Sequence, residues 1–126
     1  MKRIKAVSVN MSPFTRTLWI IANVPQEDYL KWCKKYFHVT MDVEPCSGRY
    51  NGFEKGSVVY HAIWLERYRG RTDEIGLLAH ELFHAAMAAW REVRSEVTED
   101  TEELFAAYFQ MLLVCSMADL KGQGFR

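Results

Sequence analysis

The stretch IGLLAHELFHAAMAAW, Ile75–Trp90, decides how the chain can be interpreted. Its residues are apolar nearly all round a helix, which predicts a buried helix over residues 74–90. Three positions interrupt this apolar surface, and they are His80, Glu81 and His84. Burying ionisable groups without partners is costly, so we expect these three side chains to share a compensating role.

The three residues form the pattern His-Glu-x-x-His, which is typical of a zinc site. His80 and His84 are one helical turn apart, so both imidazoles project from the same helix face. Two imidazoles placed in this way can bind one Zn²⁺ at ~2.0–2.1 Å. Glu81 lies about 100° round the helix from His80. There it can take a proton from a zinc-bound water, which predicts Glu81 as the general base.

A third metal ligand is needed, because a catalytic zinc usually keeps three protein ligands and one water. No histidine follows His84, whereas acidic residues gather at the start of the last predicted helix. We predict Glu103 as the third ligand, with Glu102 and Glu99 as alternatives. Asp100-x-x-Glu103 also matches a capping box, in which Glu103 would bond to the backbone instead.

With these residues the sequence resembles a zincin metallopeptidase of the gluzincin type, in which a Glu from a later helix completes the His-Glu-x-x-His site. Glu103 lies nineteen residues beyond His84, a spacing similar to that of thermolysin-like enzymes. The segment also resembles small phage and prophage zinc peptidases, including a repressor-cleaving type whose third ligand lies in a Glu-x-x-Ala pattern. Residues 103–106 match that pattern. The resemblance covers residues 57–113.

The resemblance implies a small, twisted, mostly antiparallel sheet packed on an active-site helix and a C-terminal ligand-bearing helix. A strand of this sheet would align a bound peptide by backbone pairing. Gluzincins often carry Asp or Asn four residues after the ligand Glu, to orient a zinc-bound His, but this chain has Ala107 there. Thermolysin-like enzymes also use a Tyr or His to stabilise the oxyanion. Tyr108 and His61 are the candidates for that role here.

The rest of the chain predicts an α+β fold, because most strands precede the two long helices. The length fits a single domain over residues 1–126. Residues 45–56, rich in Gly, Pro, Ser and Asn, predict a loop. The expected strands are residues 4–9, 17–24, 39–43 and 57–66, and the remaining expected helices are residues 25–37 and 101–120.

Composition narrows the possible classes of function. Sixteen basic and sixteen acidic side chains give zero net charge, which argues against a nucleic-acid partner. No run of apolar residues is long and uniform enough to predict a membrane span or an export signal. The three cysteines Cys33, Cys46 and Cys115 are widely spaced. They predict free thiols and a cytoplasmic protein.

Two hypotheses follow from the motif. The first is a zinc-dependent peptidase that acts on a peptide or protein substrate. The second is a catalytically inactive binding module that keeps a zincin fold and engages a host or virion protein. The short chain and the alanine at position 107 favour the second hypothesis, and the His-Glu-x-x-His pattern favours the first.

Overall fold

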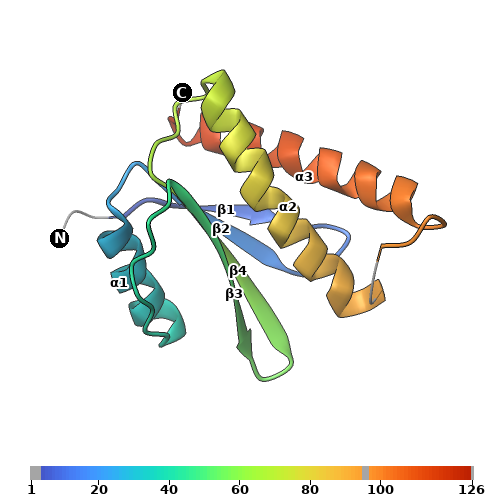
Figure 1. Cartoon of the computed structure of the whole chain (residues 1–126), viewed down its shortest axis with the longest axis horizontal. Coiled ribbons are helices and arrows are strands. Elements are labelled where there is room, and N and C mark those ends of the chain that lie inside the picture. Colours follow the sequence, from blue (N-terminus) through green and yellow to red (C-terminus); the bar gives the residue numbers. More distant parts are fainter. Residues whose placement is uncertain (1–3, 95–96, 126) are drawn as a thin grey trace.

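The computed structural model describes residues 4–94 and 97–125. It shows a four-stranded sheet with helices on both faces (Figure 1). The predicted α+β class is confirmed. The elements in chain order are β1 (Ala6–Asn10), β2 (Thr17–Ala22), α1 (Gln26–Phe37), β3 (Gly48–Lys55), β4 (Val58–Leu65), α2 (Thr72–Arg94) and α3 (Glu102–Gly122).

The strands lie in the order β1-β2-β4-β3. The two outer pairs, β1–β2 and β3–β4, are antiparallel, whereas the central pair β2–β4 is parallel. The sheet is therefore mixed, with antiparallel pairing in the majority. Within the described part of the chain β3 has a strand partner on one side only. It forms a sheet edge, and α2 packs beside it.

The strand β4 is covered on both faces, as its apolar sequence predicts. Successive side chains alternate between the faces. Ile63 and Leu65 join the apolar cluster under α2 and α3, whereas Ala62 and Trp64 join the cluster under α1. Burial on both faces fixes β4, and β4 in turn fixes the position of β3 beside α2.

Two predictions for the segment between α1 and β4 are wrong. Residues 39–43 form no strand, because β3 takes the place beside β4 and this segment pairs with no strand of the described sheet. Residues 45–56 are not a loop, since most of them form β3. Glycine disfavours strands, but pairing with the buried strand β4, including Gly52 opposite His61, overrides that local preference.

A glycine sets how closely α2 approaches β3. A methyl group at Gly48 would lie 3.0–3.2 Å from three side-chain carbons of Leu77 on α2. We expect Gly48→Ala to destabilise the fold by about 1–3 kcal/mol, because the contact is already filled. Gly76→Ala is the matched control, since a methyl group there meets open space. That control should stabilise the helix by about 0.5–1 kcal/mol. Urea unfolding measures both, and a neutral Gly48→Ala would contradict the close contact.

The helix α3 packs beside α2 through aromatic rings and covers β1 with its other buried side. The ring centroids of Phe83 and Phe105 are 5.7 Å apart, and those of Trp90 and Phe105 are 5.6 Å apart. Among the described helices, α3 alone is long and apolar enough to cross a membrane, judged by length and composition. Core helices of soluble proteins meet the same criterion.

Candidate metal centre

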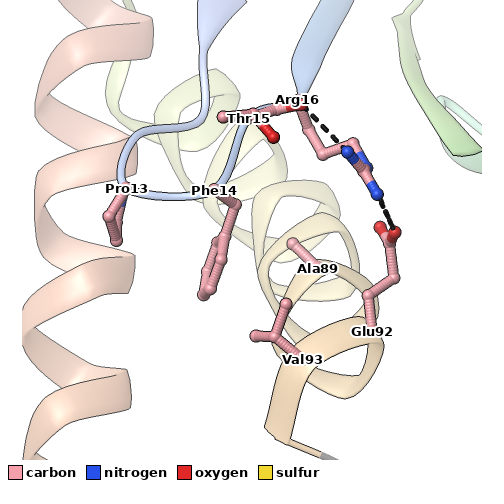
Figure 2. A pocket seen from close by; sticks show the side chains of 7 residues that line it. All are labelled: Pro13, Phe14, Thr15, Arg16, Ala89, Glu92 and Val93. Atoms are coloured by element: carbon pink, nitrogen blue, oxygen red, sulfur yellow. Dashed lines mark hydrogen bonds and ion pairs between the residues drawn. The ribbon is translucent and has the colours of Figure 1, made fainter.

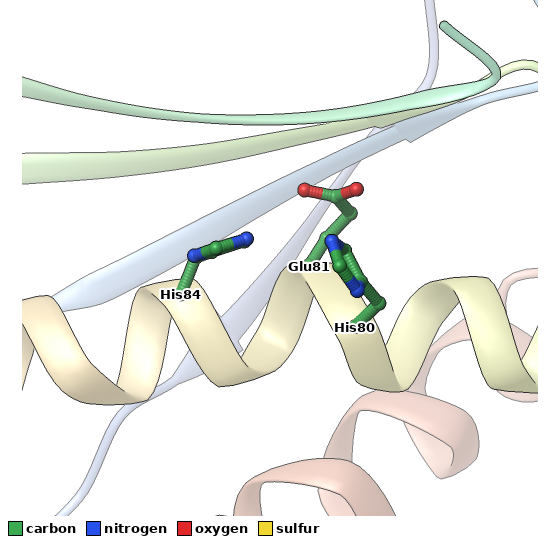
Figure 3. A group of neighbouring side chains, drawn as sticks. All are labelled: His80, Glu81 and His84. Atoms are coloured by element: carbon green, nitrogen blue, oxygen red, sulfur yellow. The ribbon is translucent and has the colours of Figure 1, made fainter.

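The structure brings His80, Glu81 and His84 together on one side of α2 (Figure 3). One potential ligand atom from each residue lies within 4.8 Å of the others. The predicted helix supplies this geometry locally, because residues one turn apart share a helix face. In Figure 3 the Glu81 carboxylate rises from α2 toward the sheet, and the rings of His80 and His84 lie nearer the helix.

Glu81 is the buried member of the group, with 5% of its surface exposed. Burial raises the pKa of its carboxyl group above the ordinary value. His80, His84 and a backbone hydrogen bond from Tyr50 on β3 oppose that rise. A raised carboxyl pKa brings proton transfer closer to neutral pH, which suits a general base. The backbone contact also ties the carboxylate to the edge strand of the sheet.

The two histidines are exposed, contrary to the prediction that all three residues are buried. The reason lies in the packing of α2, which buries its other sides against β3, β4 and α3 and leaves one strip to solvent. An exposed imidazole can be reached by a metal ion and by a substrate. The exposure of the two imidazoles makes the group more suitable as a metal site, because nothing among the described residues covers both rings.

The acidic candidates for the third ligand lie elsewhere. Glu102 and Glu103 are exposed in the first turn of α3, and Glu99 is exposed in the turn before it. Within the described residues, the His80–Glu81–His84 group includes none of the three. The ring of Phe83, which precedes His84 in α2, packs against Phe105 and Phe109 on α3. The third ligand therefore stays a prediction from the sequence.

The oxyanion candidates are also placed away from the group. Tyr108 is buried on α3, and its ring lies 4.8 Å from that of Phe14. His61 is fully buried on β4, where its Nδ1 is 2.6 Å from the hydroxyl of Tyr50. The metal-binding group found among the described residues does not include His61.

Tyr50 is the neighbour of the site that sequence reasoning missed. Its ring lies nearly parallel to that of His84, at an interplanar angle of 19° and with centroids 6.4 Å apart. Tyr50 stands in the segment that composition predicts to be a loop, so no period-2 pattern pointed to it. The one available signal was the pair Gly48 and Gly52 on either side of it, because glycine inside a strand can mark a close approach by another part of the chain.

The donor set fits a zinc ion, because two imidazoles and a carboxylate are ligands that zinc accepts. If Glu81 is the general base, His80 and His84 are the two metal ligands of this group. A catalytic zinc centre needs a third protein ligand as well. Comparison with known proteins adds nothing to this geometry. No protein-family model matches the chain, and no similar curated protein or solved structure was found.

Proposed function

We propose that this chain is a zinc-dependent peptidase of the zincin type. The observation that carries the proposal is the grouping of His80, Glu81 and His84, with two exposed imidazoles beside a buried carboxylate. A purely structural histidine pair would leave the burial of Glu81 without a purpose, since an isolated buried carboxylate is costly. Three free thiols fit a cytoplasmic location for this activity.

In this proposal the residues divide the work between metal binding and proton transfer. His80 and His84 hold the ion, with Glu103 as the predicted third ligand and Glu102 or Glu99 as the alternatives. A bound zinc ion supplies a Lewis acid and lowers the pKa of its water toward neutrality. Glu81 accepts the proton of the attacking water and then delivers it to the leaving amine.

The edge strand β3 is the proposed platform for the substrate backbone. It has an open side in the described sheet, and α2 packs next to it. The Tyr50 backbone already hydrogen-bonds to Glu81, so a chain extended along β3 would run past the general base. An extended peptide can add to such an edge by main-chain hydrogen bonds. We therefore propose an unfolded or extended protein segment as the substrate.

The direct test combines metal analysis with a cleavage assay. We expect the purified chain to bind one zinc ion and to cleave members of a peptide library. Removal of the metal with a chelator should abolish cleavage, and added zinc should restore it, because the metal supplies the activated water. Cleavage that persists in the metal-free protein would contradict the proposed chemistry.

The alternative function is a zincin-fold binding module without catalytic activity. The observation that favours it is the missing third ligand in the described group, together with alanine at position 107. The same experiment separates the two functions. A protein that takes up no zinc, or binds it without cleaving any peptide, supports the binding module.

A further inference from the structure

The side chain of Tyr50 connects the metal-binding group to a second, buried histidine. Its ring is nearly parallel to the imidazole rings of His84 and His61, with centroids 6.4 and 5.9 Å from theirs. Aromatic rings interact at these separations. The Tyr50 hydroxyl is also 2.6 Å from Nδ1 of His61, a short hydrogen bond that anchors the phenol ring.

The connection continues from His61 to the surface. Nε2 of His61 faces Oε1 of Glu92 at 3.5 Å, and among the described residues neither of these buried atoms has another hydrogen-bond partner. The other oxygen of Glu92 accepts hydrogen bonds from Nε and Nη2 of Arg16, at 3.1 and 2.8 Å. Figure 2 shows this ion pair at a pocket of about 200 Å³ beside the β1–β2 turn. This series of contacts therefore runs from His84 on α2 to Tyr50 on β3 and His61 on β4. It then returns to α2 at Glu92 and ends at the guanidinium group of Arg16.

The position of the proton on His61 decides which atom donates each hydrogen bond in this series. The Glu92 carboxylate faces Nε2 of His61, so a proton on Nε2 is favoured and Nδ1 is left to accept from the Tyr50 hydroxyl. Burial lowers the pKa of His61, with Glu92 opposing the change, so a neutral ring is favoured. A neutral ring that accepts at Nδ1 carries its proton on Nε2, which then points at Glu92.

A glycine makes room for the hydroxyl. Gly52 lies opposite His61 in the β3–β4 pairing, and a methyl group there would come 2.9 Å from the Tyr50 oxygen. No real side-chain carbon approaches an oxygen so closely without displacing it. A residue without a side chain at position 52 therefore permits the Tyr50–His61 hydrogen bond.

We propose that Tyr50, anchored through His61 and Glu92 to Arg16, is the positioning residue that orients His84 as a metal ligand. This inference rests on the proposed function, since it assumes that His84 binds the metal. Position 107, four residues after the predicted ligand Glu103, is alanine and offers no polar side chain for this role. A ring held in place beside the imidazole restricts its orientation by packing, as hydrogen-bonded outer partners do for other metal-binding imidazoles.

The test is zinc affinity, measured with Tyr50→Phe and Tyr50→Leu. The phenylalanine keeps the ring but loses the anchor, and the leucine loses both. We expect zinc binding to weaken by about 10-fold for Tyr50→Phe and by about 100-fold for Tyr50→Leu, the range found for outer partners of metal ligands. The visible spectrum of the Co²⁺-loaded protein should also change at saturating metal, which a loss of stability alone would not cause.

The matched control is Tyr29→Phe. It removes another tyrosine hydroxyl with a hydrogen bond inside the protein, 2.8 Å from Asn51, but on the α1 side of the sheet. Its zinc affinity and Co²⁺ spectrum should equal those of the unmodified protein. Arg16 is the partly exposed last member of this series of contacts. Arg16→Gln should weaken zinc binding by about a few fold, as the Tyr50 variants do more strongly. If the Tyr50 variants do not fold, the zinc affinity of Arg16→Gln tests the positioning role instead.

The outcomes distinguish this inference from the proposed function. If the unmodified protein binds no zinc, the proposed function itself fails. If it binds zinc and loses it on His84→Ala, but Tyr50→Phe and Tyr50→Leu bind zinc normally with unchanged Co²⁺ spectra, the positioning role alone is overturned. Equal weakening in Tyr29→Phe would also overturn it, because the effect would then follow from any lost hydroxyl in the core.

Discussion

Glu81→Gln is expected to lower peptide hydrolysis by about 100- to 10,000-fold while zinc remains bound. Glutamine has the shape of glutamate and keeps an oxygen for the hydrogen bond from the Tyr50 backbone, but it cannot accept the proton of the attacking water. Both imidazoles stay in place, so the metal stoichiometry should not change. Single-turnover cleavage of a peptide found in the library assay, together with metal analysis, measures both quantities.

The stability of the Glu81→Gln protein provides an independent readout. Burial raises the pKa of Glu81, which means that the fold disfavours its ionised form. The neutral amide should therefore unfold, in the metal-free protein, at a temperature no lower than that of the unmodified chain. Glu27→Gln on the exposed side of α1 is the control for an exchanged charge. Full activity in Glu81→Gln would exclude the proposed role of this residue.

His84→Ala is expected to weaken zinc binding by more than about 100-fold, beyond the effect of losing an outer partner. The variant removes one of the two imidazoles on which the site depends, and cleavage should disappear with the metal. Its fold should persist, because the His84 side chain is exposed and contributes little to the apolar core. Isothermal titration with zinc, with circular dichroism of the metal-free protein alongside, checks both statements.

The control for His84→Ala is a histidine outside the site. His38 ends α1 with a positive φ of 58°, a conformation that asparagine tolerates better than alanine. His38→Asn should therefore leave zinc affinity unchanged without straining the backbone. If His84→Ala binds zinc as tightly as His38→Asn does, the ion is held elsewhere and the assignment of this centre is wrong.

The same titration assigns the third ligand. Glu103→Gln, Glu102→Gln and Glu99→Gln each remove one acidic candidate without changing shape. The structure keeps all three outside the metal-binding group of the described residues, so a ligand among them must approach the histidines when the metal binds. Normal affinity in all three variants would leave only His80 and His84 from the original ligand prediction, and would favour the binding-module alternative.

Elements with a strong sequence period were predictable. The strands β1, β2 and β4 and the three helices fall within a few residues of their expected ranges, because apolar spacing reports which side of an element is buried. The grouping of His80, Glu81 and His84 was predictable for the same reason, since helix geometry alone places residues one turn apart side by side. None of this required knowledge of distant contacts.

The edge strand β3 and the surroundings of the site were not predictable. Gly48 and Gly52 weaken the strand signal, yet one lets Leu77 approach and the other leaves room for the Tyr50 hydroxyl. Each glycine is needed for a close contact, one with α2 and the other with a neighbouring side chain. The amino-acid composition alone predicts a loop at these positions. The exposure of the histidines was likewise missed, because it depends on which side of α2 the sheet and α3 leave uncovered.

The sequence by itself determined the pair of imidazoles, the carboxylate between them and the helix that carries all three, since these depend on local periodicity. Only the tertiary structure decided that Glu81 is buried beside β3 and that Tyr50 contacts both His84 and His61. These features arise where elements far apart in the chain pack together. The physical reason is that local spacing sets the direction of a side chain along its own element, whereas burial and partners depend on what the rest of the fold places against it.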